Sequence, residues 1–337
     1  MATAELELPR RVLAGGGPSS PDARVLRAMG LPVIGQFDPA FTHIMDDVMD
    51  LARRVFLTRN RRCFPVSGLA SAGLEAVLNS LIEPGDGVGI GGGTQFAETA
   101  GEIAARCGAR VPSLDHVDQS PRLVVAPLVD PGTATRLDLE ALPSGPIKVI
   151  EATHALAASE LRVDEWRIDV CVAGADHGVG APSGMALVTY SDEVEARMHS
   201  RKQPPRTSYL DLVQLQAYWS PERLNHHTAP TSLVYGLHEA LRLVLVEGLE
   251  ARWRRHRRAG NALRDGIRAF GLNVNGELPF AIVEPVRDAA RTELLERYGV
   301  HVALVQPDTW RVGLLGADAT PETVLHVLSA FEKVLDR

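Results

Sequence analysis

The side chains most able to do chemistry in this sequence lie in two short segments, Glu151–Ala155 (EATHA) and Asp176–His177. Each segment ends or closely follows an apolar, β-branched run that predicts a strand, so Glu151 and His177 are expected on adjacent strand ends. A histidine paired with a carboxylate is a competent general base, because the carboxylate orients the ring and raises its pKa. The predicted catalytic residues are therefore His177, Glu151 and Asp176.

The same segments also contain possible metal ligands. Glu151 and His154, three residues apart and followed later by Asp176 and His177, supply nitrogen and oxygen atoms that suit zinc, iron or manganese. The spacing matches no strong metal motif, and adjacent Asp and His on an extended segment would point to opposite faces. We therefore predict no metal site and prefer acid/base chemistry.

Short apolar runs alternate with helical periods, and this pattern predicts an α/β fold. The long helical period 249–270 is expected to leave the main domain. It divides the chain into a large domain (12–248) and a small C-terminal domain (249–337). The expected strands are Val88–Ile90, Leu123–Ala126, Lys148–Glu151, Asp169–Ala173, Met185–Thr189, and segments near Ala281–Val286 and Trp310–Leu314. The expected helices are Ala40–Val55, Ser71–Leu81, Ala97–Cys107, Asp192–Ser200, Ser232–Gly248, Leu249–Phe270, Ala289–Tyr298 and Pro321–Leu335.

Composition narrows the function classes. The chain has 337 residues and a net charge of −7, which argues against nucleic acid or an anionic membrane as its main partner. Three scattered cysteines fit free thiols in a reducing compartment, and no apolar run approaches the length of a membrane span. We therefore expect a cytoplasmic protein. The arginine-rich stretch Arg252–Arg258 is expected to be a solvated helix face.

Several blocks, in order from about residue 12 to the C-terminus, resemble the alanine–glyoxylate / serine–pyruvate branch of the class V aminotransferases. The resemblance implies the type I fold of pyridoxal phosphate (PLP)-dependent transferases. That fold has a large domain with a mixed, mostly parallel seven-stranded sheet and a small C-terminal α/β domain. It also implies a homodimer with active sites at the interface. The matching blocks are Pro21–Met49, Phe64–Ala76, Val163–Val170, Ala181–Gly184, Tyr209–Leu212, His226–Pro230, Leu249–Gly260 and Trp310–Gly316.

The chain departs from the family at the cofactor lysine. The family's lysine forms a Schiff base with the aldehyde of PLP and then shuttles protons. In the matching segment Ala173–Gly184 (AGADHGVGAPSG) the lysine position is His177, and the preceding glutamine, a phosphate ligand in the family, is Asp176. Imidazole forms no stable imine with an aldehyde, so the covalent anchor is missing.

The residues at the family's phosphate site also differ from those of the family. The family's Ser-Gly-Thr-Gly turn reads Ser67-Gly68-Leu69-Ala70, so one hydroxyl is lost. Asp176 would place a carboxylate about 4–5 Å from the phosphate, at a cost of roughly 3–4 kcal/mol per unit charge. Asp130, near a serine position of the family, would add to this repulsion, and Glu151 replaces the aspartate that pairs with the pyridine nitrogen. The stretch between Leu123 and Glu151 is also too short for the family's intervening helix.

Other family positions persist. Arg311 matches the arginine that binds the substrate carboxylate, and a bidentate guanidinium group suits that role. Phe96 matches the aromatic residue that stacks on the cofactor ring. Thr228 matches a phosphate ligand at the family's interface, Ser71 lies at the start of the helix that faces the phosphate, and both are read as vestigial cofactor-binding residues. The predicted substrate-binding residues are Arg311, Phe96 and His154.

These observations predict an acid/base enzyme that uses no PLP and acts on a small carboxylate-containing metabolite. Two alternatives remain open. The protein could be a noncatalytic pseudo-aminotransferase that serves as a partner or scaffold, or an atypical transaminase that binds PLP without a lysine. The sequence does not name the substrate.

Overall fold

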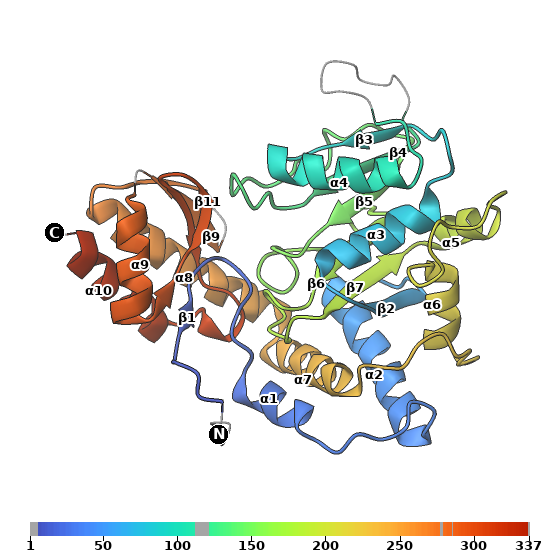
Figure 1. Cartoon of the computed structure of the whole chain (residues 1–337), viewed down its shortest axis with the longest axis horizontal. Helices are drawn as coiled ribbons and strands as arrows, with labels where there is room; N and C mark the ends of the chain where they lie inside the picture. The colour runs from blue at the N-terminus through green and yellow to red at the C-terminus, as the bar shows by residue number, and fades with distance from the viewer. Residues whose placement is uncertain (1–5, 112–120, 277–278, 285, 336–337) are drawn as a thin grey trace, which may run out of the picture.

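A computed structural model describes residues 6–111, 121–276, 279–284 and 286–335. It shows a large sheet-centred part and a smaller C-terminal part beside it (Figure 1). The resemblance predicted this arrangement.

The central sheet has the order β2-β7-β6-β5-β4-β3. Strands β3 to β6 are parallel, and β7 runs antiparallel to both of its neighbours, β2 and β6. Every residue of β4, β6 and β7 is buried, as expected for a mostly parallel sheet covered on both faces. The strands are β2 (Arg62–Ser67), β3 (Val88–Ile90), β4 (Leu123–Pro127), β5 (Ile147–Glu151), β6 (Val170–Gly174) and β7 (Met185–Tyr190).

The described part of this sheet has six strands, where seven were expected. Beside β3, the place of a seventh strand is marked by an isolated parallel bridge between Gly87 and Arg110. The backbone of Arg110 exchanges hydrogen bonds with Asp86 and Val88 there. The residues that follow, 112–120, lie outside the described part.

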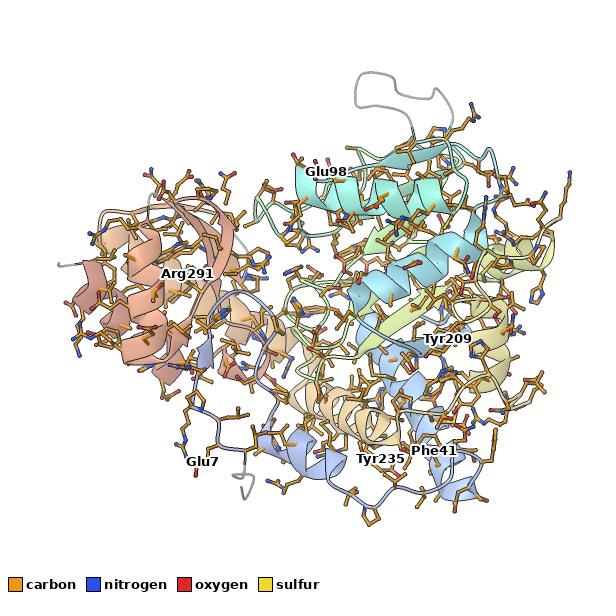
Figure 2. All side chains as sticks on the ribbon, in the orientation of Figure 1. Glu7, Phe41, Glu98, Tyr209, Tyr235 and Arg291 are labelled. Carbon is orange, nitrogen blue, oxygen red and sulfur yellow. The ribbon has the colours of Figure 1, made fainter. Side chains whose placement is uncertain are left out.

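Seven helices in the described residues belong to the large part. Helix α2 begins at Pro39 because the carboxylate of Asp38 accepts from the amide of Ala40, and proline suits the first helical position. It packs against β2 and α7, and the ring of Phe41 meets Tyr235 edge-on (Figure 2). The helices are α1 (Ala23–Met29), α2 (Pro39–Phe56), α3 (Ala70–Leu81), α4 (Thr94–Arg106), α5 (Asp192–His199), α6 (Leu212–Trp219) and α7 (Thr231–Glu247).

The connection from β4 to β5 contains no helix, although the two strands are parallel and such crossovers usually contain one. A connection without a helix was expected, because the stretch between Leu123 and Glu151 is short. Within this connection, Asp138–Leu142 forms only a turn.

The C-terminal part contains an antiparallel sheet of order β11-β12-β9-β8. Near the N-terminus, β1 (Val12–Leu13) pairs in parallel with β10 (Val300–His301), so the first strand packs with the C-terminal part. The division at residue 248 stays a prediction. None of the helices in the described residues has the length and apolar run that a membrane span requires. The elements are α8 (Leu249–Ala269), β8 (Asn273–Asn275), β9 (Phe280–Glu284), α9 (Asp288–Tyr298), β11 (Ala303–Gln306), β12 (Thr309–Gly313), the 3₁₀ turn Gly316–Asp318 and α10 (Pro321–Leu335).

Candidate active site

Asp176 and His177 lie in the turn that follows β6 and contact each other. Nδ1 of His177 is 2.9 Å from Oδ1 of Asp176, and the hydroxyl of Ser183 donates to the other carboxylate oxygen at 2.8 Å. Burial alone would raise the pKa of Asp176, but the hydrogen bonds from His177 and Ser183 lower it below its ordinary value. The expectation that the two side chains point to opposite faces is wrong, because the segment is a turn and not an extended strand.

The N-terminal loop that contains three successive glycines, residues 15–17, covers this pair. We call it the glycine loop. The backbone amide of Ser19 donates to the carbonyl of Asp176 at 2.8 Å, and its hydroxyl donates to the carbonyl of His177 at 2.6 Å. Gly17 has φ +120°, and a β-carbon there would lie 1.9 Å from Cδ2 of His177. Only glycine fits at this position, and the backbone of the loop forms one wall around the imidazole.

Glu151 ends β5 and is joined to the end of β6 through Thr153. Its Oε1 accepts from the amide of Thr153 at 2.9 Å and from the hydroxyl of the same residue. The amide of Gly174 in turn donates to that hydroxyl at 2.8 Å. Burial raises the pKa of Glu151, and the two hydrogen bonds from Thr153 only partly oppose this. The hydrogen-bond partner of His177 is therefore Asp176, and Glu151 interacts with it only at longer range.

His154 lies next to His177 without a polar partner. Its ring centroid is 4.7 Å from that of His177 and 5.3 Å from that of Phe280. The side chain is buried, and in the described part of the chain neither ring nitrogen has a hydrogen-bond partner. Burial, together with His177 and Arg311, lowers the pKa of His154 well below its usual value. Its ring is thus neutral and able to bond a polar ligand.

Arg311, on β12, faces the same region. Its Nε donates to the carbonyl of Gly15 at 2.7 Å and its Nη1 to that of Pro131 at 3.3 Å. Its Cζ lies 5.8 Å from the ring centroid of Phe280. Burial lowers the pKa of Arg311, and within the described residues it forms no ion pair with a carboxylate. A ligand carboxylate would supply the missing counter-charge.

Phe96 and Asp130 lie together at a separate cavity of about 480 Å³, whose lining does not include His177, Glu151 or Arg311. Asp130 accepts from the backbone amides of Gly93, Gly132 and Thr133. These bonds give Asp130 a structural role in joining two turns.

The positions that match phosphate ligands are open to solvent. Ser71 and Thr228 are exposed, and Leu69, which caps α3 without a side-chain hydrogen bond, is 53% exposed. The whole chain has three lysines, Lys148, Lys202 and Lys333, and none of them lies in the segments that form this site. Within the described residues, no cluster of three or more His, Cys, Asp or Glu side chains could hold a metal ion.

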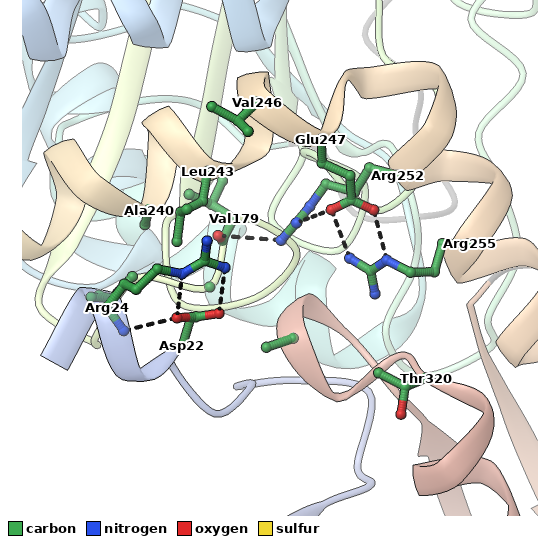
Figure 3. A pocket seen from close by; sticks show the side chains of 13 residues that line it. Asp22, Arg24, Val179, Ala240, Leu243, Val246, Glu247, Arg252, Arg255 and Thr320 are labelled. Atoms are coloured by element: carbon green, nitrogen blue, oxygen red, sulfur yellow. Dashed lines mark hydrogen bonds and ion pairs between the residues drawn. The ribbon is translucent and has the colours of Figure 1, made fainter.

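Two positioning residues were missed because the arginine-rich stretch was read as a solvated face. Arg252 is 6% exposed and donates to the carbonyls of Gly178 and Val179, directly after His177, while Glu247 neutralises it (Figure 3). His256 is fully buried; its Nδ1 bonds the carbonyl of Arg252 and its Nε2 accepts from the amide of Gly316. Arg252 and His256 are four residues apart and lie beside Leu249 and Trp253. This spacing is typical of the buried stripe of a helix and could have revealed that both side chains are buried.

Residues 32–37 and 225–230, where we expect the subunit interface of the homodimer that the resemblance implies, are joined by hydrogen bonds. The side chain of Gln36 donates to Asn225 at 3.1 Å and accepts from the amide of Ala229 at 2.7 Å. Large apolar side chains are exposed in or beside the two segments, at Leu31, Val33, Phe37 and Leu224.

Comparisons with known proteins agree with this architecture. The family model described as aminotransferase class-V matches residues 40–277. A (S)-ureidoglycine–glyoxylate transaminase from Bacillus subtilis is 37% identical over 99% of this chain and 92% of its own length. The crystal structure of a ureidoglycine–glyoxylate aminotransferase from the same organism has a TM-score of 0.93 at 37% identity, covering 99% of this chain and 95% of that one. An alanine–glyoxylate aminotransferase from Nostoc sp. has a TM-score of 0.93 at 30% identity, covering 99% and 98% of the two chains.

The alignment with the B. subtilis transaminase runs over 388 positions, although this chain has only 337 residues. At least 51 of those positions (388 − 337) therefore have no residue in this chain. The loss is consistent with the helix-free crossover between β4 and β5.

Proposed function

Since the chain belongs to the class V aminotransferases, we propose that it is a repurposed member in which Asp176 and His177 perform acid/base chemistry on a small carboxylate-containing metabolite without PLP. The observation that carries this proposal is the 2.9 Å contact between Nδ1 of His177, which the resemblance matches to the family's lysine, and Oδ1 of Asp176. Because Asp176 favours its ionised form, Nδ1 carries the proton and donates it. This leaves the Nε2 lone pair of His177 as the base.

The surrounding residues have complementary roles in the proposal. Arg311 holds the substrate carboxylate, because its partly buried guanidinium group has carbonyl partners but no carboxylate in the described residues. Burial raises the pKa of Glu151 and so shifts it toward its protonated form, and we assign it the role of giving a proton to a developing enolate oxygen. The neutral ring of His154 completes the polar wall and binds the substrate.

The relatives are PLP-dependent aminotransferases, and that likeness by itself favours PLP over no cofactor. The residues of this chain do not fit PLP held as a Schiff base. No amine lies in the site segments, and a carboxylate that favours its ionised form lies beside the lysine position. The turn that matches the family's phosphate-binding turn contains Leu69, whose exposed side chain cannot donate a hydrogen bond to phosphate. We therefore assign no step to PLP.

Hydrogen–deuterium exchange into pyruvate in D₂O tests the proposal without knowledge of the natural product. Pyruvate carries a carboxylate for Arg311 and methyl protons next to a carbonyl. His177 would remove one of these protons at C3 and return a deuteron to the same carbon. Proton NMR should show exchange faster than in buffer, and His177→Gln should lower the rate about 10²–10⁴-fold.

Arg311→Gln should act mainly by raising the pyruvate concentration needed for half-maximal exchange, since it removes binding shared by ground and transition states. Wild-type exchange no faster than buffer, for pyruvate and for a panel of other small 2-oxo acids, would contradict the proposal. So would an unchanged rate in His177→Gln.

A noncatalytic role is the second candidate, and the glycine loop favours it. Gly17 packs directly against the ring of His177, and Gly15 already bonds Arg311, so little space remains around the two side chains. A stable complex with a lysine-containing relative, together with no exchange activity, would support this alternative. The third candidate is an atypical transaminase that binds PLP without a lysine; transamination of glyoxylate, a substrate named for the relatives, would support it.

We further propose a cytoplasmic homodimer that recognises no nucleic acid or membrane. The net charge of −7 and the joined interface segments 32–37 and 225–230 support this assignment. The division into domains 12–248 and 249–337 is also retained as a proposal, with β1 packed against the second domain.

A further inference from the structure

A cavity of about 690 Å³ lies where the crossover from β4 to β5 lacks its helix. One wall comes from the crossover itself at Ala134–Arg136, and another comes from Trp166, which precedes β6. Helix α8 supplies Trp253 and Arg257. A second cavity, of about 550 Å³, shares Arg136 and Trp166 with the first. These walls include none of the residues assigned above to the acid/base site.

The described lining of this cavity contains two arginines, Arg136 and Arg257, and one carboxylate, that of Glu160. Arg136 donates to the hydroxyl of Ser159 at 3.3 Å and to the carbonyl of Glu160 at 2.5 Å, which are both neutral acceptors. The carboxylate of Glu160 is engaged by Arg162 at 2.6 Å. Within the described residues neither Arg136 nor Arg257 forms an ion pair. Two guanidinium groups thus line the cavity without an ion pair in the described residues, and Glu160, which pairs with Arg162, acts on Arg136 only through longer-range charge.

The aromatic walls favour a flat ligand. The guanidinium carbon of Arg136 lies 5.2 Å from the ring centroid of Trp166, which stacks the positive charge on an indole face. Trp253 is 6% exposed, and in the described part its buried indole nitrogen has no acceptor. A buried donor without an acceptor is costly unless water or a ligand reaches it. The volume lies within the usual range for small-molecule sites.

We propose that the cavity between Arg136 and Arg257 binds an organic anion that carries a planar aromatic ring. Arg136 and Arg257 bind the anionic group, and Trp166 provides the surface for the ring. Because Arg136 belongs to the crossover and Arg257 to α8, the ligand bridges the large and C-terminal parts of the molecule. The site is independent of the proposed acid/base function.

Adenosine monophosphate (AMP) is a suitable probe, since it has both a ring and an anionic group. Adenosine lacks the anion, and inorganic phosphate lacks the ring. Titration of the full chain should show saturable quenching of tryptophan fluorescence by AMP. Adenosine should bind about tenfold or more weakly, and phosphate should compete with AMP.

Arg257→Gln should weaken AMP binding about tenfold or more, measured by calorimetry, whereas Arg258→Gln should not change it. Arg257 and Arg258 are both exposed neighbours on α8, and Arg258 lines a different cavity, so this pair controls for general loss of charge. Trp166→Phe should reduce the fluorescence change while AMP binding persists. The proposal is overturned if AMP does not bind, if adenosine binds as tightly as AMP, or if the two arginine variants behave alike.

Discussion

Nδ1 of His177 lies 2.9 Å from Oδ1 of Asp176, its immediate neighbour in the chain. Such contacts between adjacent side chains require a turn, and this turn is held from three sides. Ser19 bonds the carbonyls of Asp176 and His177, Ser183 bonds the carboxylate, and Arg252 bonds the next two carbonyls. The pair is therefore fixed in one orientation, with Nε2 as the ring atom available for chemistry.

Replacing the carboxylate should disable this base. In Asp176→Asn the side-chain amide can donate to Nδ1 and so favours the ring tautomer in which Nε2 carries the proton. We expect pyruvate exchange to fall by about 10²–10⁴-fold. Ser183→Ala removes a hydrogen bond to the same carboxylate but keeps its charge, and should lower the rate much less. Equal rates in wild type and Asp176→Asn, measured by proton NMR in D₂O, would show that Asp176 does not set the tautomer.

The purified protein should be colourless in the presence of PLP. His177 forms no stable imine, and the phosphate site lacks a hydroxyl at Leu69. Absorbance spectra and borohydride reduction followed by mass spectrometry check this. His177→Lys alone should not restore alanine–glyoxylate exchange, because Asp176 and Leu69 are independent defects. A stable yellow species that borohydride fixes to the wild-type chain would contradict the proposed loss of PLP.

The sequence blocks that resemble the family, in their order along the chain, made the fold predictable. The contacts within the site could be predicted only in part. The ends of β5 and β6 were placed to within one residue, which brought Glu151 near His177. The sequence does not specify which carboxylate bonds His177, because that depends on the turn after Gly174. Asp130 was expected to lie close enough to the phosphate position to repel it, yet it bonds backbone amides at a separate cavity.

The place of the glycine loop over His177 was not predicted from the sequence. Its position depends on long-range contacts, such as the pairing of β1 with β10 and the bond from Arg311 to Gly15. The burial of Arg252 and His256 was missed for a related reason. Charge composition suggested solvent, whereas helical spacing puts these two residues on the stripe that faces the core.

Gly17→Ala should destabilise the protein. The new β-carbon would collide with the ring of His177, and the backbone at φ +120° is unfavourable for any residue with a side chain. We expect a loss of about 1–3 kcal/mol in the free energy of unfolding, measured with urea. Gly101→Ala is the control, because Gly101 lies within α4 and its nearest neighbour would be 3.8 Å away. It should be neutral or stabilising by up to about 1 kcal/mol. Similar losses in both variants would argue against tight packing at Gly17.

The protein should be a dimer through the surface formed by segments 32–37 and 225–230. Val33 is 69% exposed there, and Val246, on α7 outside these segments, is also 69% exposed. Val33→Asp should shift the protein toward monomer in sedimentation velocity, because it buries a charge at an apolar contact. Val246→Asp should leave the dimer intact. A wild-type monomer at micromolar concentration, or equal effects of both substitutions, would exclude this interface.

His256 should make the stability of the protein fall on acidification. Burial, followed by the charges of Arg252 and Arg255, lowers the pKa of His256 from 6.5 to about 3. Between these values the unfolded chain holds a proton that the folded chain excludes. The contribution of the neutral His256 ring to stability is therefore complete above pH 6.5 and is lost progressively as pH falls toward 3. In that window the titration of His256 lowers the free energy of unfolding by about 1.4 kcal/mol for each pH unit of acidification.

His256→Gln can keep a donor and an acceptor near the carbonyl of Arg252 and the amide of Gly316 but does not titrate. Urea unfolding from about pH 6 down to about pH 4 should give a slope against pH that is shallower than wild type by about 1.4 kcal/mol per unit. His154, whose pKa is also lowered by burial, remains in this variant, so part of the acid dependence should persist. His43→Gln, at an exposed side chain on α2, should leave the slope unchanged. If His256→Gln and wild type show the same slope, His256 is not held neutral in the folded protein.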